Sequence, residues 1–248
     1  MMCDVERFAW LCEEEAAVVE RGNGEAIGTY GEKRLHRILK RFVCADIHGH
    51  EVRVGRYVAD VLCDGRITEI QTGSLRPLLP KLRSYLEQTD YDVTVLHPIL
   101  AEKTLFRMEK ETGELLSKKR SPKKARIEDA LCELYWLSEI FPSPRLTVQV
   151  LLIRADEHRF SERMRYRKEG AYDSELYPRA LLDCVTWHTA EDFAPFLPPE
   201  CDSFTAAEYA KHSKLKNRKL YSALNFLCAA GLLTREKEEK HYRYFVNK

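Results

Sequence analysis

The sequence lacks the patterns that define several protein classes. None of its eight cysteines forms a CxxC pair, so it predicts neither a zinc site nor a disulfide framework. It has no apolar run of membrane-spanning length, and residues 1–20 are acidic, without the basic start and apolar core of a secretory signal. We therefore expect a cytoplasmic protein with reduced cysteines and no membrane partner.

The composition is that of a globular protein with an uneven charge distribution. The 248 residues are 44% hydrophobic and 32% charged, which allows one large domain or two smaller ones. The net charge is only +1, but residues 1–31 hold seven acids and two bases, whereas residues 202–248 hold ten bases and five acids. A basic end of this kind favours a polyanionic partner.

The most informative stretch is Tyr57–Thr72, which predicts a β-hairpin around Asp64-Gly65. A two-residue type I′ turn needs positive φ at both central positions, and Asp-Gly is a preferred pair for it. This turn places Asp60 directly opposite Glu69. Side chains alternate between the faces of a strand, so one face carries Val58, Asp60, Leu62, Ile67, Glu69 and Gln71.

Two facing acids require a compensating positive charge. Like charges in directly opposed positions are destabilising, and a divalent cation would remove the repulsion. Carboxylate and amide oxygens are the ligands that Mg²⁺ and Mn²⁺ prefer. The alternative is a solvated face on which Asp60 and Glu69 pair with nearby Arg or Lys side chains. Against that alternative, the same face carries Leu62 and Ile67, which indicates partial burial.

The chain around the hairpin predicts a defined order of elements. We expect helices at 4–20, 30–44 and 77–88, and strands at 51–55 and 92–97, the last ended by Pro98. A second hairpin is expected at 104–117, followed by a basic segment, 117–126, that is either a solvated linker or a phosphate contact. Glu32 lies in the first turn of the second helix, where favourable interaction with the helix dipole would alone explain an acid.

These features resemble the PD-(D/E)XK nuclease superfamily over residues 27–98. The resemblance is carried by Asp60, by Glu69-Ile70-Gln71 at the (D/E)xK position, by Glu32 on the preceding helix, and by the order of elements. The Ala59-Asp60-Val61-Leu62 and Glu69-Ile70-Gln71 segments are similar to the CoiA-type competence branch. The resemblance implies a restriction-endonuclease-like αβββαβ core, in which Asp60, Glu69 and Glu32 hold Mg²⁺ or Mn²⁺ for the hydrolysis of DNA phosphodiester bonds.

One residue departs from the family pattern. Gln71 stands where the family usually has a lysine. An amide can ligate a metal or orient a water, but it carries no charge and transfers no proton at neutral pH. Some family members recruit a lysine from elsewhere, and Lys81 on the next helix is the candidate here. A plain exposed helix lysine is the alternative for Lys81, and a catalytically inactive DNA-binding or regulatory protein is the alternative for the whole chain.

The middle of the chain is less informative. We expect a helix at 126–141 and buried strands at 146–153 and 181–188. Residues 154–168 hold five arginines with Phe160 and Tyr166 between them. This pattern suits nucleic acid and equally suits surface ion pairs.

The last part of the chain resembles a winged helix-turn-helix domain. Thr205-Ala-Ala-Glu208 is a capping box that opens a short helix, a second helix is expected at 215–230, and two strands follow at 232–236 and 241–246. In that family the second helix enters the major groove. The resemblance implies DNA contacts from Lys216, Asn217, Arg218, Lys219, Tyr221, Ser222, Asn225, Lys240 and Arg243. Protein contacts or dimerisation are the alternative use of such a domain.

The sequence thus predicts an α/β (α+β) protein with four segments. They are an N-terminal packing helix (1–24), the nuclease-like core (25–116), a basic linker with an α/β extension (117–200) and the winged helix (201–248). The expected function is a Mg²⁺-dependent or Mn²⁺-dependent deoxyribonuclease acting on duplex or branched DNA. The expected catalytic residues are Glu32, Asp60, Glu69, Gln71 and Lys81. A homodimer is compatible with the sequence.

Overall fold

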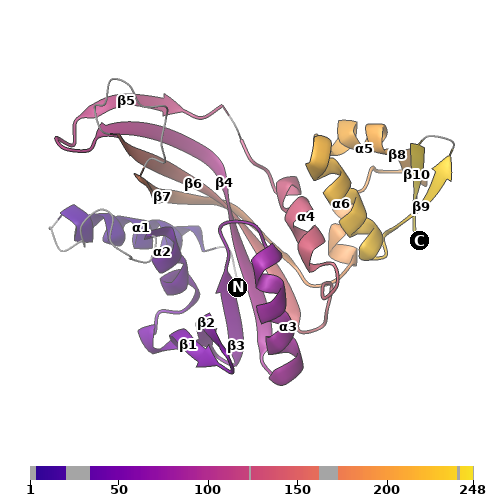
Figure 1. The fold of residues 1–248 in the computed structure, drawn as a ribbon, viewed down its shortest axis with the longest axis horizontal. Coiled ribbons are helices and arrows are strands. Elements are labelled where there is room, and N and C mark those ends of the chain that lie inside the picture. Colours follow the sequence, from indigo (N-terminus) through magenta and orange to yellow (C-terminus); the bar gives the residue numbers. More distant parts are fainter. Residues whose placement is uncertain (1–3, 21–33, 123, 162–172, 239–240, 248) are drawn as a thin grey trace. The chain divides into compact units, whose positions relative to one another are not determined.

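A computed structural model describes residues 4–20, 34–122, 124–161, 173–238 and 241–247 (Figure 1). Within these residues the chain is a mixed α/β protein, as predicted. A seven-stranded sheet has the order β1-β2-β3-β4-β6-β7, with β5 paired to β4, and a separate three-stranded sheet has the order β8-β10-β9. The chain forms two compact units, and the long strands β4 (Asp92–Glu109), β6 (Leu146–Ser161) and β7 (Asp173–Trp187) contribute to both.

The first unit contains residues 1–50, 98–125 and 151–184. Its helices α1 (Val5–Glu20) and α2 (Arg34–Val43) pack through Phe8 and Phe42, whose rings meet edge to face at 5.5 Å. The short 3₁₀ helix η1 (Ile47–Gly49) follows α2. The second half of β4 pairs antiparallel with β5 (Leu115–Arg120), and this hairpin is close to the one predicted at 104–117.

The second unit contains residues 51–97, 126–150 and 185–248. Strands β1 (His50–Val54), β2 (Tyr57–Cys63) and β3 (Arg66–Ile70) are followed by the 3₁₀ helix η2 (Arg76–Leu78) and by α3 (Leu79–Gln88). Strand β3 pairs antiparallel with β2 and parallel with the start of β4. A parallel pair needs a crossover connection, which α3 provides. The observed order α2, β1, β2, β3, α3, β4 is the predicted one.

The rest of the second unit is a helical cluster with the small sheet. It comprises α4 (Glu128–Leu134), η3 (Tyr135–Leu137), η4 (Glu191–Phe196), β8 (Ser203–Thr205), α5 (Ala206–Ser213), α6 (Asn217–Ala229), β9 (Leu233–Glu238) and β10 (His241–Val246). The predicted capping box is confirmed, since the Thr205 hydroxyl accepts from the Glu208 backbone and the Glu208 carboxylate accepts from the Thr205 backbone. Helix α4 contacts α6 along its length (Figure 1).

Three predictions about local structure were wrong. Strand β4 does not end at Pro98 but continues to Glu109. Its pairing with β3 ends at Leu96, so the missing N–H of Pro98 removes no hydrogen bond from that pair. The basic segment 117–126 begins as strand β5 rather than as a linker, and the helix predicted at 126–141 is limited to α4 and one 3₁₀ turn.

Two expectations about chemical environment can be compared with the structure. In the described part of the chain no helix is long and apolar enough to cross a membrane. The described cysteines, at positions 12, 44, 63, 132, 184, 201 and 228, form no disulfide bonds.

Candidate active site and nucleic-acid interface

The β2–β3 hairpin has the predicted turn and register. Asp64 and Gly65 have φ values of 50° and 72°, as a type I′ turn requires. The paired residues are Val61 with Thr68, Leu62 with Ile67 and Cys63 with Arg66, and the next pair in this register is Asp60 with Glu69. The Asp60 carboxylate (Oδ2) accepts a hydrogen bond from the Ile70 backbone N–H at 2.7 Å, which fixes the acid against β3.

Glu69 is a buried carboxylate with a lysine partner. Its side chain is 1% exposed, so the alternative is wrong in placing Glu69 on a solvated face, whereas the pairing with a lysine that the same alternative expected is confirmed. Lys81 extends from α3, and its Nζ lies 2.5 Å from Glu69 Oε2. Because the lysine side chain is 19% exposed, the pair connects a buried carboxylate to the protein surface. The structure therefore brings Asp60, Glu69 and Lys81 together.

The electrostatics of this cluster raise the pKa of the Glu69 carboxyl group. Burial, and next the charge of Asp60, raise the pKa of Glu69 from 4.5 to about 7, while Lys81 acts in the opposite direction. The buried Tyr85 hydroxyl lies beside Glu69, and its own pKa is raised by burial and by the charges of Glu69 and Asp60. Asp60 of β2, Glu69 of β3 and Tyr85 of α3 therefore lie close enough for the charge of one to shift the pKa of another.

The buried oxygen atoms of the cluster are ligands of the kind that a hard cation prefers. Glu69 Oε1 and the Tyr85 hydroxyl are both buried, and within the described residues neither has a partner of ideal geometry, but the hydroxyl lies close enough to donate a weak hydrogen bond to the Glu69 carboxylate. A buried carboxylate oxygen with only one weak donor can still accept a ligand or a water. The described residues contain no group of three or more His, Cys, Asp or Glu that could hold a metal. A cation here would be held by two acids and neutral oxygens, and Glu32, the predicted third acid, lies outside the described residues.

Gln71 follows β3 in a loop that is fixed from several directions. Its side-chain Nε2 donates to the Ser74 carbonyl at 2.7 Å, which leaves Oε1 as the atom suited to a ligand. The His97 ring donates from Nδ1 to the Gln71 carbonyl at 2.6 Å. Burial lowers the pKa of His97, so the ring is neutral and its proton lies on Nδ1. The Glu133 carboxylate of α4 accepts from the Leu75 backbone N–H at 3.1 Å.

Sequence reasoning missed Tyr85, His97 and Glu133. Tyr85 lies one helical turn after Lys81, so the same face of α3 carries both side chains, and this spacing was the one available signal. His97 and Glu133 reach the loop through tertiary contacts across 26 and 58 residues of sequence. No local pattern encodes such contacts.

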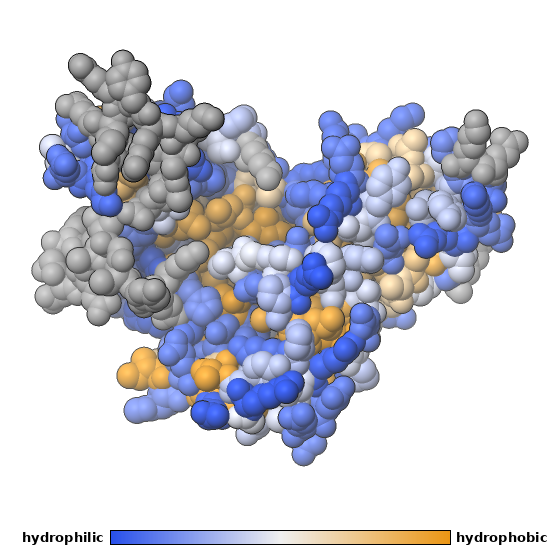
Figure 2. Space-filling view, in the orientation of Figure 1, coloured by the Kyte–Doolittle hydropathy of each residue, from blue (hydrophilic) through white to orange (hydrophobic). Residues whose placement is uncertain are grey.

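The predicted DNA-contacting residues lie on α6 and β10 of the second unit. Lys216, Asn217, Arg218, Lys219 and Tyr221 are exposed, and Ser222 and Asn225 are half-buried. Lys240 lies outside the described residues. Hydrophilic side chains predominate around these elements on the face shown in Figure 2.

Two of these cations already have acidic partners within the chain. The Lys219 ammonium lies 2.5 Å from Asp129 Oδ1 of α4, and Arg243 Nε lies 2.9 Å from Glu238 Oε1. The Arg218 guanidinium lies over the Trp136 ring at 5.8 Å. A nucleic acid would have to compete for Lys219 and Arg243, whereas Lys216 lies exposed at the start of α6.

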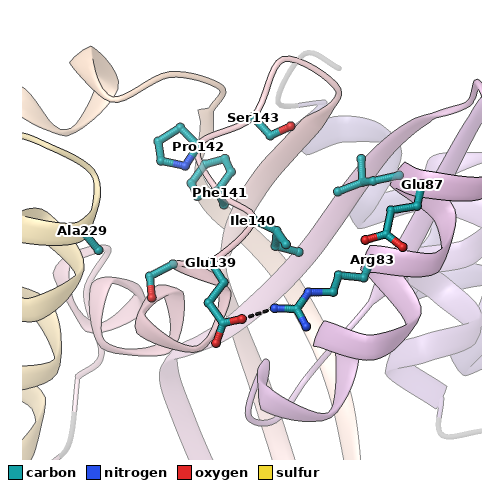
Figure 3. A pocket seen from close by; sticks show the side chains of 10 residues that line it. Arg83, Glu87, Glu139, Ile140, Phe141, Pro142, Ser143 and Ala229 are labelled. Atoms are coloured by element: carbon teal, nitrogen blue, oxygen red, sulfur yellow. Dashed lines mark hydrogen bonds and ion pairs between the residues drawn. The ribbon is translucent and has the colours of Figure 1, made fainter.

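A surface hollow of about 400 Å³ lies elsewhere on the second unit (Figure 3). Arg83, Leu86 and Glu87 of α3 form one wall, and the loop 138–143 with Ala229 forms the other. Arg83 and Glu139 form an ion pair across it. None of the predicted site residues lines this hollow, so it is separate from the acidic cluster.

Comparison with known proteins identifies a family without a known activity. Residues 33–190, more than half of the chain, match the model of a domain of unknown function, DUF8091. The chain belongs to this family. The DUF8091 region includes Asp60, Glu69, Gln71, Lys81 and His97, and it ends before β8. No curated protein and no solved structure matches the chain.

Proposed function

We propose that this protein is a metal-dependent DNA nuclease that hydrolyses phosphodiester bonds at the Asp60–Glu69 cluster. The observation that carries the proposal is the state of Glu69. It is buried beside a second acid, Asp60, its pKa is raised to about 7, and its hydrogen-bonding neighbours are Lys81 and the Tyr85 hydroxyl. Burying a second acid beside Asp60 costs free energy, which a functional role of the pair would explain.

Each residue has a distinct part in the proposed reaction. Asp60 and Glu69 would hold Mg²⁺ or Mn²⁺, with Glu32 as a further ligand. Such an ion, when bound, neutralises charge on the phosphate and lowers the pKa of a coordinated water. Lys81 supplies the positive charge that Gln71 lacks, close to where charge develops on the phosphate. The Gln71 amide oxygen orients a water, held in place by the contacts of Gln71 with Ser74 and His97.

Two features of the fold support this proposal. The order α2, β1, β2, β3, α3, β4 is that of the restriction-endonuclease-like core, and it places the acids on adjacent strands. The C-terminal elements β8, α5, α6, β9 and β10 follow the order expected of a winged helix, with basic residues at the start of α6. Phosphate attraction by such a domain would deliver the nuclease to DNA.

The test is cleavage of single-stranded, duplex and branched DNA by the purified protein with Mg²⁺ or Mn²⁺. We expect the wild type to cleave at least one substrate, chelation to stop the reaction, and Asp60→Ala and Glu69→Ala each to reduce the rate by about 10²-fold or more. Lys81→Met should also reduce the rate, whereas Lys81→Arg should retain part of it because it keeps the charge. Equal rates for wild type and both acid variants on every substrate would exclude the proposal.

One observation favours a second function, that of a nuclease-like DNA-binding protein without catalysis. The Gln71 amide already bonds the Ser74 carbonyl and Lys81 already pairs with Glu69, so both side chains have partners within the chain. In that case DNA binding persists while no substrate is cleaved. The cleavage assay together with a binding assay separates the two functions.

A further inference from the structure

The two strands after α6 separate their charged residues by face. Strand β10 pairs with β9 so that Tyr244 lies opposite Arg235 and Tyr242 opposite Lys237. Because side chains alternate between faces, these four share one face. The other face carries Glu236 and Glu238, and Arg243 on that face is ion-paired with Glu238. The described part of β9 therefore presents only basic charge on the first face.

Helix α6 covers part of this face and leaves part open. Tyr244 is 2% exposed, whereas Tyr242, two residues earlier, is 46% exposed. On α6 itself Tyr221 is 55% exposed, and it lies one helical turn before Asn225, which accepts a hydrogen bond from Arg235 of β9. Two exposed tyrosines, Tyr221 of α6 and Tyr242 of β10, thus lie on the elements that Asn225 and Arg235 connect.

Arg235 is held in place beside the Tyr242 ring. The Arg235 guanidinium lies 5.1 Å from the centre of the Tyr242 ring, and its Nη1 donates to Asn225 Oδ1 of α6 at 2.8 Å. These contacts fix Arg235 of β9 relative to β10 and α6. A side chain that is already ordered loses less entropy when it binds a ligand.

We propose that Tyr221, Asn225, Arg235, Lys237 and Tyr242 form a base-stacking surface for unpaired nucleotides. Exposed tyrosine rings stack on bases of any sequence, and Arg235 and Lys237 attract the phosphates between them. Duplex DNA hides its base faces, so this surface selects single-stranded or unpaired segments. The inference rests on the proposed function, because it names the form of nucleic acid that the proposed nuclease would bind.

The test is a binding measurement that needs no catalysis. Fluorescence anisotropy in EDTA compares an oligothymidylate of roughly 15 nucleotides with an abasic oligomer of the same length and charge. We expect the wild type to bind the oligothymidylate more tightly. Tyr221→Ala and Tyr242→Ala should each weaken that binding by about five-fold or more while leaving the abasic oligomer unaffected. Arg235→Gln should weaken binding of both oligomers because it removes a phosphate contact.

Tyr91→Ala is the matched control, since Tyr91 is an exposed tyrosine of the same unit outside this surface. Its binding should equal that of the wild type. Equal wild-type affinity for the two oligomers, or an unchanged preference in both tyrosine variants, would overturn the inference. It would also be overturned if neither oligomer binds and Tyr242→Ala instead dissociates a dimer in sedimentation. Because EDTA prevents cleavage, a protein that binds as predicted but never cleaves DNA would contradict only the proposed nuclease.

Discussion

At the scale of single residues, Glu69 determines what the cluster can do. A carboxyl group with a pKa of about 7 is partly protonated at neutral pH, and a bound cation would displace that proton. Asp60 differs because it is half-buried and accepts a backbone hydrogen bond from Ile70. The two acids of one hairpin thus have different environments, a common arrangement at sites that bind metals or transfer protons.

This environment predicts a pH dependence of stability. The pKa of Glu69 is higher in the folded protein than its ordinary value of 4.5, so the folded state binds the proton more tightly. The stabilisation of the folded state by this tighter proton binding is fully present below pH 4.5 and is lost as the pH rises through about 7. The loss is on the order of 3 kcal/mol. Glu69→Gln should therefore be more stable than the wild type at pH 8 and nearly equal to it near pH 4.5, as measured by urea unfolding.

Glu87→Gln, which removes an exposed carboxylate from α3, is the control and should not show this difference. At pH 8, Mn²⁺ should raise the melting temperature of the wild type and not that of Glu69→Gln, because only the wild type offers the second carboxylate. A Glu69→Gln profile parallel to that of the wild type from pH 4.5 to 8 would show that Glu69 keeps an ordinary pKa.

At the scale of elements, the β2–β3 hairpin determines where the acids lie. Its register could be predicted because Asp64-Gly65 favours one turn type, and that turn fixes every cross-strand pair. Pairing of Glu69 with a basic side chain could be proposed from sequence only as one of two options, and Lys81 could not be identified as that partner. The course of β4 beyond Pro98 could not be predicted, because a proline is tolerated there only where pairing with β3 has ended.

The turn itself can be tested by substitution. Gly65 has a φ of 72°, and a Cβ added there would meet no atom within 4 Å, so the cost of Gly65→Ala comes from the backbone alone. We expect a loss of about 1 kcal/mol in the free energy of unfolding. Asp64→Asn should be neutral, since asparagine also tolerates positive φ. A neutral Gly65→Ala would indicate that the turn relaxes to another type.

At the scale of the whole molecule, segments far apart in sequence share one core. In the second unit, Phe226 of α6 lies 4.9 Å from Phe193 of η4 and 6.3 Å from Phe141 after η3, measured between ring centres. The Arg126 guanidinium also binds the Ser213 carbonyl at the end of α5. The elements of residues 201–248 were predictable from their capping box and apolar stripe. Their contact with α4 was not, because nothing local to either segment specifies it.

This shared core predicts cooperative unfolding of the second unit. Phe226 is fully buried, so Phe226→Ala should lower the free energy of unfolding by about 3–5 kcal/mol. The loss should appear at α3 and the hairpin as well as at α6, in hydrogen exchange followed by mass spectrometry. Lys211→Ala, a change to an exposed side chain of α5, should have little effect. Faster exchange confined to residues 201–248 would show instead that these residues unfold alone.

The central claim is that Asp60 and Glu69 form a metal-dependent phosphodiesterase site. The most direct measurement compares Asp60→Asn with Asp64→Asn, two acids of the same hairpin, in the cleavage of the preferred DNA substrate at saturating Mn²⁺. Asp60 faces Glu69, whereas Asp64 lies exposed in the turn. The account predicts wild-type cleavage by Asp64→Asn and a loss of about 10²-fold or more in Asp60→Asn. Equal cleavage rates for the two variants would contradict it.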